Sequence, residues 1–215
     1  MVCTDAGLSS VGNRKYNDMG GRAFITTQSI KKLKKHLKEW ALEPTGWRLP
    51  GKGGEYDIAM IEKPEYQKQL TKRCGGELSI KSETFYKERW TKEDGLEQKM
   101  IVTYSIKYRD YQHNIRAGQI ERAGRLIETN PTKLKKANQN DYKRFIKKTH
   151  VTSDGEAAEK ELYSIDAHII AAEEIYDGFY AVCTNLEDSP AKIIKINHKC
   201  WKIEECFRLS ANCMK

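Results

Sequence analysis

The stretch MVCTDAGLSSVGNRKYNDMGGRAFITT, residues 1–27, indicates the fold class. Its first four residues have the composition of a short buried strand, and Ser9 or Ser10 can cap a helix that continues to about Met19. Two glycines then end this helix, and residues 23–27 are typical of a second strand. A strand–helix–strand unit joins parallel strands through a right-handed crossover, so we expect an α/β protein.

Residues 44–109 differ in character from the opening stretch. Glycines cluster at the start of this segment, and short β-type runs occur at residues 56–61, 84–90 and 99–107. The last of these runs, KMIVTYSIK, has the strongest strand pattern in the chain. The segment therefore predicts a β-rich insertion between two α/β parts.

After this segment, the chain is expected to return to the helices and strands of the core. A long helix is predicted at about residues 109–129, and residues 178–184 have a strong strand pattern. A last helix should begin at Pro190, because proline suits the first helical position, and end near Leu209. We therefore expect a first part of the α/β core at residues 1–43, the β-rich insertion with its long helix at 44–160, and a second part of the core at 161–215.

The chain is basic, with 38 lysines and arginines against 30 aspartates and glutamates and a formal net charge of +8. Such an excess suits a polyanionic partner, because basic side chains that neutralise phosphates release counterions. Charge alone leaves an unrelated basic protein open. RNA-binding modules of the RNP and KH types are disfavoured because their motifs are absent.

Four lysines can form one cationic face on a helix expected at residues 30–40, beside apolar residues such as Ile30 and Leu37. A lysine face is commonly only solvated, so this pattern by itself leaves DNA binding open. The four are Lys31, Lys34, Lys35 and Lys38.

Six cysteines are scattered along the chain without a CxxC pair or zinc-finger spacing. This pattern favours free thiols in a reducing cytosol over a disulfide framework. No stretch approaches the roughly 18 apolar residues of a membrane span, and the N-terminal residues lack the features of a signal peptide. We therefore expect a cytoplasmic protein.

Two carboxylates are candidates for chemistry. Asp5 follows the first predicted strand, where α/β folds place ligands and metals, although an aspartate there is more often a turn or capping residue. Glu204 lies on the last predicted helix, where spacing alone favours an ordinary solvated side chain. The residue pattern alone therefore predicts no specific reaction.

Five segments give the chain a recognisable order of motifs. They are TDAGLSSVGNRKYND (4–18), GRAFITTQSIKKLKKHLKEWAL (21–42), ETFYKERWTKEDGLEQKMIVTYSIKYRDYQ (83–112), DGFYAVCTNLED (177–188) and INHKCWKIEECFR (196–208). Together they resemble DDE transposases of bacterial insertion sequences, in the branch with a β-rich insertion before the catalytic glutamate. The resemblance extends from Val2 to Arg208.

In that family the fold is RNase H-like, and three carboxylates hold two divalent metal ions. The resemblance implies that Asp5, which precedes Ala-Gly, and Glu204 are two of these three catalytic residues and metal ligands. Paired Mg²⁺ ions on carboxylate oxygens activate the attacking water or 3′-hydroxyl and stabilise the leaving oxygen in phosphoryl transfer. The implied fold is a partial RNase H-like α/β fold, interrupted by the β-rich insertion.

The sequence also departs from the family pattern. The family's first aspartate would precede Met1, so the resemblance implies a C-terminal part of such a transposase. The tyrosine, arginine and lysine around the glutamate fall on Asn197, Cys200 and Ala211, which cannot make the same charge-assisted phosphate contacts. We therefore expect weak Mg²⁺ binding and no efficient strand cleavage by the two remaining carboxylates.

The partner implied by the resemblance is transposon-end DNA in the bacterial nucleoid, bound by a homodimer or by a dimer with a full-length transposase. The lysines of residues 31–38 would contact phosphates, and Arg208 is a further DNA-binding candidate. Arg89 and Trp90 would contact phosphate or stack on a flipped base. A purely structural place for Trp90 in a β core is an equally open alternative. The alternative function is a non-catalytic DNA-binding remnant that inhibits a full-length transposase.

Overall fold

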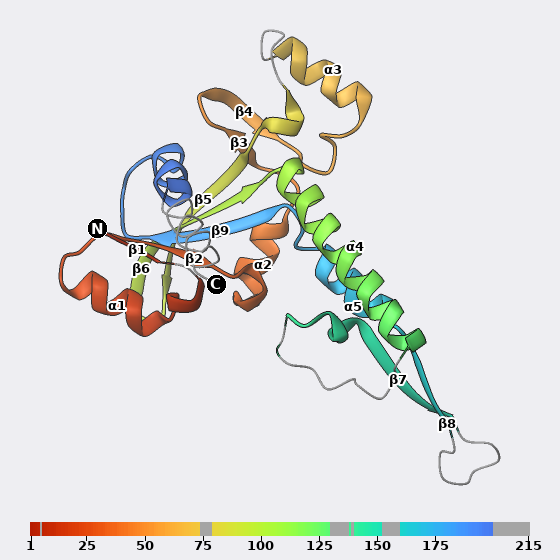
Figure 1. Ribbon diagram of the computed structural model, residues 1–215. Coiled ribbons are helices and arrows are strands. Elements are labelled where there is room, and N and C mark those ends of the chain that lie inside the picture. Colours follow the sequence, from red (N-terminus) through yellow and green to blue (C-terminus); the bar gives the residue numbers. More distant parts are fainter. Residues whose placement is uncertain (5, 74–78, 130–137, 139, 152–159, 200–215) are drawn as a thin grey trace, which may run out of the picture. The chain divides into compact units, whose positions relative to one another are not determined.

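The computed structural model divides the chain into two compact units (Figure 1). Unit 1 consists of Met1–Lys107 and Gly178–Lys215, and unit 2 of Tyr108–Asp177. The residues described by the structure are 1–4, 6–73, 79–129, 138, 140–151 and 160–199. Across these ranges no helix is both long and apolar enough to cross a membrane.

Unit 1 is built on a seven-stranded sheet with the order β1-β2-β9-β6-β5-β3-β4 (Figure 1). β1 and β2 are parallel, and the other neighbouring pairs are antiparallel. The sheet and the helices around it confirm an α/β protein. The strands are β1 (Val2–Thr4), β2 (Phe24–Gln28), β3 (Trp47–Leu49), β4 (Lys52–Tyr56), β5 (Phe85–Glu93), β6 (Leu96–Tyr104) and β9 (Phe179–Thr184).

The predicted strand–helix–strand unit at the start of the chain is confirmed. β1 leads through a short 3-10 turn, η1 (Ala6–Leu8), to α1 (Val11–Met19) and then to β2. Ser10 is the helix cap, since its hydroxyl accepts a 3.1 Å hydrogen bond from the backbone N–H of Asn13. β1 pairs with β2 and lies at one edge of the sheet that the described strands form.

The central hairpin joins β5 and β6 through the two-residue turn Asp94-Gly95. Both residues have positive φ, 54° for Asp94 and 74° for Gly95. This geometry matches the twist of the flanking strands and is the reason that Asp-Gly pairs favour tight hairpins. The nine residue pairs from Phe85↔Tyr104 to Glu93↔Leu96 make this hairpin the longest strand pairing of the sheet.

Both faces of the sheet are covered by helices. A helix over residues 190–199 packs on one face, where Ile193 joins a buried cluster with Ile25, Ile101 and Val182. Met100 of β6 and Gln28 of β2 point to the other face, where they meet α1 and α2 (Lys35–Leu42). Pro190 is the first residue of the helix on the first face, as expected.

An aromatic cluster fills the part of unit 1 near β3. The Trp47 ring lies 6.1 Å from that of Tyr104 and 5.8 Å from that of Phe179, and the Trp47 side chain is fully buried. Its indole N–H donates a 2.8 Å hydrogen bond to the backbone carbonyl of Glu43. α3 (Pro64–Arg73) and the short turn η3 (Ile80–Ser82), which were not predicted, complete this region.

Unit 2 consists of one long helix, a shorter helix and a hairpin. α4 (Ile106–Thr129) confirms the predicted long helix, and the β7–β8 pairing is antiparallel. Ala123 and Phe145 are fully buried in this unit. Its other elements are η4 (Tyr142–Phe145), β7 (Ile146–Val151), β8 (Lys160–Ile165) and α5 (Ala167–Glu174). The sequence pattern predicts a strand at residues 162–165, within β8, whereas η4, β7 and α5 were not predicted.

Two predicted elements were wrong. The single helix at residues 30–40 is instead a 3-10 turn, η2 (Ile30–Lys32), followed by α2, because Leu33 and Lys34 have extended backbone angles. The strand at residues 56–61 ends at its first residue. There the Asp57 carboxylate accepts a 2.8 Å hydrogen bond from the backbone N–H of Ala59 and stabilises a turn.

The two compact units divide the chain after Lys107 and after Asp177. Strands before and after residue 43 belong to one sheet, since β2 pairs with β9 and β9 pairs with β6. The strands between residue 44 and Lys107 therefore share a sheet with β1 and β2, and the division into core and insertion stays a prediction.

Candidate nucleic-acid interface

The excess positive charge of the chain lies entirely in unit 1. This unit contains 26 lysines and arginines against 18 aspartates and glutamates, whereas unit 2 contains 12 of each kind. Because attraction to a polyanion depends on such an excess, unit 1 is the part of the chain suited to nucleic acid.

The lysines of η2 and α2 form an exposed basic segment on unit 1. Lys31, Lys32 and Lys35 are exposed, and Lys38 is half-buried. Ile30 and Leu37 are buried beneath them, at 6% and 3% exposure. The apolar residues therefore anchor the segment and leave ammonium groups in solvent, which is the geometry that phosphate contacts require.

Lys34 contacts two carboxylates at the β5–β6 turn, whereas the ammonium of Lys35 lies 3.8 Å from the carboxylate of Glu39, one helical turn away. The Lys34 ammonium donates to the carboxylate of Glu93 and, at 3.3 Å, to that of Asp94. The hydrogen bond with Glu93 raises the pKa of Lys34, and the same bond lowers the pKa of Glu93. Lys34 therefore ties the start of α2 to the β5–β6 turn, which reduces its availability for a phosphate.

Arg89 and Trp90 lie on opposite faces of the sheet. The Arg89 guanidinium lies 5.3 Å from the ring centre of Trp40, on the face that carries α2. Trp90 is 45% exposed and has the ammonium of Lys99 at 5.5 Å from its ring centre. Trp90 is thus a surface residue, and the two side chains cannot form one continuous contact with DNA.

Lys99 is a buried lysine that holds the chain before the last described helix. Its ammonium donates to the backbone carbonyls of Glu187 at 3.1 Å and Asp188 at 2.9 Å. The carboxylate of Glu88 lies 3.6 Å away. Sequence patterns did not single out Lys99, because its carbonyl acceptors are distant in the chain and local composition does not reveal them.

Replacing Lys99 with methionine is expected to lower the free energy of unfolding of unit 1 by about 1–3 kcal/mol, since the backbone carbonyls of Glu187 and Asp188 lose a charged donor. Urea denaturation followed by circular dichroism measures this loss. Lys92→Met is the matched control, because Lys92 lies exposed on the neighbouring strand. Equal stability of the two variants would show that Lys99 does not anchor the 187–188 segment.

Three of the sequence-predicted site residues, Asp5, Glu204 and Arg208, lie outside the described residues. Within the part of the chain that the structure describes, no three His, Cys, Asp or Glu side chains converge as metal ligands. Mg²⁺ binding by Asp5 and Glu204 therefore stays a prediction. Asn197 donates a 3.2 Å hydrogen bond to the Tyr180 hydroxyl.

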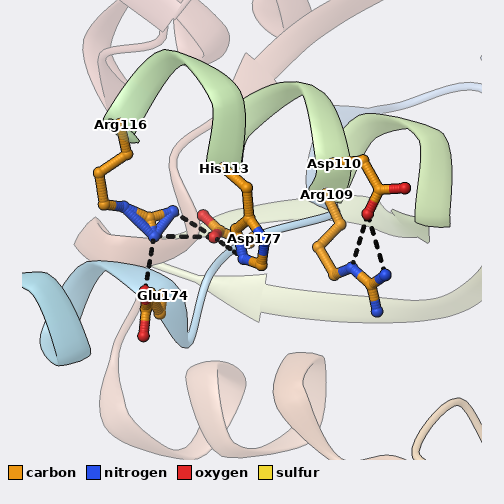
Figure 2. A network of polar contacts seen from close by, with 6 residues as sticks. All are labelled: Arg109, Asp110, His113, Arg116, Glu174 and Asp177. Atoms are coloured by element: carbon orange, nitrogen blue, oxygen red, sulfur yellow. Dashed lines mark hydrogen bonds and ion pairs between the residues drawn. The ribbon is translucent and has the colours of Figure 1, made fainter. Parts of the chain in front are cut away.

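Unit 2 contains a buried polar network that the sequence did not indicate (Figure 2). The Asp177 carboxylate accepts hydrogen bonds from both terminal nitrogens of Arg116, one at 2.9 Å, and lies 2.7 Å from Nε2 of His113. Glu174 lies 3.7 Å from Arg116. Figure 2 also shows Arg109 of α4 paired with its neighbour Asp110 rather than with this network.

This network joins α4 to the end of α5 within unit 2. The side chains of Arg116 and Asp177 are only 7% and 6% exposed, whereas that of His113 is 49% exposed. A buried pair that satisfies its own hydrogen bonds has little capacity to bind a ligand, so we assign it a structural role. The spacing of His113 and Arg116 on one helix face was visible in the sequence, but their shared partner was not.

Comparison of the chain with protein-family models, with curated proteins and with solved structures found no match.

Proposed function

We propose that this chain acts in DNA transposition as a DNA-binding protein that contacts DNA phosphates through unit 1. The observation that carries the proposal is the confinement of the net charge to unit 1, together with the exposed lysines of η2 and α2. Transposition as the process rests on the ordered resemblance of five segments to DDE transposases.

The RNase H-like architecture is part of the same proposal. Two features support it: β1 and β2 are parallel strands joined through α1, and Asp5 follows β1 directly. The helix that covers residues 190–199 packs on the sheet through Ile193, and Glu204 follows it in the sequence. These features are consistent with two carboxylates of one metal site.

We further propose that the chain binds DNA without efficient cleavage. Family members surround their glutamate with a tyrosine, an arginine and a lysine. Here the tyrosine position is Asn197, a neutral amide already bonded to Tyr180. The loss of charge-assisted contacts to phosphate weakens the stabilisation of charge that phosphoryl transfer requires.

The test is the affinity of the purified chain for duplex DNA as a function of salt. If the basic segment engages about four phosphates, the logarithm of the binding constant should fall with the logarithm of salt concentration with a slope of about −3.6. The expected cleavage result is intact DNA after incubation with Mg²⁺. No binding at low salt would refute the DNA-binding proposal, and Mg²⁺-dependent nicking lost in Asp5→Asn and Glu204→Gln would refute the absence of cleavage.

A further inference from the structure

Arg14 is a buried arginine on α1 whose charge has no carboxylate partner among the described residues. The residue is 8% exposed. One terminal nitrogen donates a 3.0 Å hydrogen bond to the side-chain carbonyl of Gln98, a neutral acceptor. Its Nε is buried and has no hydrogen-bond partner. A guanidinium in such surroundings loses hydration without gaining a counter-charge, which is unfavourable unless an anion binds.

The neighbouring thiol does not supply that counter-charge. Cys183 is fully buried beside Arg14, and burial raises the pKa of Cys183 to about 11. The thiol is therefore neutral at physiological pH, even though Arg14 opposes the effect of burial. Among the described residues, the positive charge of Arg14 therefore has no anionic partner at this position.

Arg14 lines a pocket of about 130 Å³ that extends to the surface of unit 1. The pocket lies between α1 and α2, over Gln98 and Met100 of β6. Its volume is several times that needed for one water molecule and suffices for a tetrahedral anion with a few waters. The exposed Lys32 and Lys34 lie at its solvent-facing side, whereas Arg14 is its buried cation.

The acidic residues of the pocket are engaged by Lys34. Glu93 and Asp94 both line the pocket, and both accept from the ammonium of Lys34. Lys32 has no such carboxylate contact among the described residues. Three cations and two carboxylates line the pocket, which leaves its described lining with a net charge of +1, and Arg14 and Lys32 are the cations without a carboxylate contact there.

We propose that this pocket binds a phosphate monoester or free phosphate, with Arg14 as the deep contact and Lys32 as the outer one. A phosphate monoester carries a charge near −2 at pH 7 and three acceptor oxygens, which can accept hydrogen bonds from Lys32 and from the forked donors of Arg14. A backbone phosphodiester is substituted on two sides and cannot reach a nearly buried guanidinium in this way. The pocket would therefore take a chain end or a small phosphate ester, which a basic surface for duplex DNA does not require.

The first experiment is thermal unfolding of the full chain with inorganic phosphate, at ionic strength held constant with chloride. A saturable rise in the midpoint with phosphate is expected for the wild type. Lys32→Ala should weaken the apparent phosphate affinity by about five- to tenfold, the usual scale for one charge-assisted contact. Lys63→Ala, which removes an exposed lysine outside the pocket, should leave it unchanged.

Arg14→Met separates a ligand-binding role from a structural one. If Arg14 serves the ligand, the variant should lose the phosphate response and be at least as heat-stable as the wild type without phosphate. Absence of a phosphate response in the wild type would overturn the proposal. If Arg14→Met does not fold, the proposal is overturned when Lys32→Ala binds phosphate as tightly as Lys63→Ala.

A second arm distinguishes the sources of the phosphate. A short oligonucleotide with a 5′-phosphate is compared with the same oligonucleotide carrying a 5′-hydroxyl. Preference for the phosphorylated end, lost in Lys32→Ala, would assign the pocket to a nucleic-acid end. Binding of inorganic phosphate without such a preference would assign it to a small phosphate ester. Neither result depends on duplex binding by the basic segment, so this proposal and the proposed function can fail separately.

Discussion

Replacing Arg116 with methionine is expected to lower the free energy of unfolding of unit 2 by about 3–5 kcal/mol, because the change leaves the buried carboxylate of Asp177 without its cation. Methionine keeps much of the apolar volume of the side chain, so loss of charge and hydrogen bonds dominates. His113 remains beside Asp177 but offers a single nitrogen in place of two. Amide hydrogen exchange across α4 and α5, with urea denaturation, measures the loss.

Two further variants identify the cause of this loss. Arg125→Met removes an arginine from the same helix whose side chain is 66% exposed and pairs with the exposed Glu121, so about 0–1 kcal/mol is expected. The double variant Arg116→Met, Asp177→Leu should recover most of the stability, since no unpaired charge remains buried. A double variant as unstable as Arg116→Met would show that the network does more than neutralise a buried carboxylate.

The elements that sequence predicted well are those whose determinants are local. The Ser10 cap, the glycines after α1 and the apolar residues of β2 lie within one short stretch, and the structure forms the expected unit there. The β5–β6 hairpin likewise has a local cause, the Asp94-Gly95 turn. By contrast, Lys34 at the break between η2 and α2 pairs with Glu93, 59 residues away, and no local pattern contains this contact.

For the candidate interface too, sequence predicted local features but not contacts between residues distant in the chain. The exposure of Lys31 and Lys35 followed from helix periodicity over a buried Ile30 and Leu37, although the helix was shorter than expected. The separation of Arg89 from Trp90 could also have been foreseen, because neighbouring residues of a strand point to opposite faces. The unpaired charge of Arg14 could not be, since it depends on which side chains from α1, β6 and β9 meet inside unit 1.

Replacing Lys31, Lys35 and Lys38 together with glutamine is expected to weaken DNA binding by a factor on the order of 10²–10³ at about 0.1 M salt. Each lysine that contacts a phosphate should also remove about one unit from the salt slope, so that the slope becomes shallower by two to three units. Fluorescence anisotropy of a labelled duplex over a series of salt concentrations measures both quantities. Circular dichroism checks that the fold is retained, since none of the three residues is buried.

A matched triple variant separates a local contact from the effect of net charge. Lys63, Lys68 and Lys72 are exposed lysines in and beside α3, and their replacement with glutamine removes the same charge from the same unit. Long-range attraction alone would make both triple variants equally weak, because each leaves the chain with a formal charge three units below +8. If η2 and α2 contact phosphates directly, the variant at Lys31, Lys35 and Lys38 must lose more DNA affinity than the α3 variant. Equal losses would place the DNA contacts elsewhere on unit 1 and remove the basic segment from the interface.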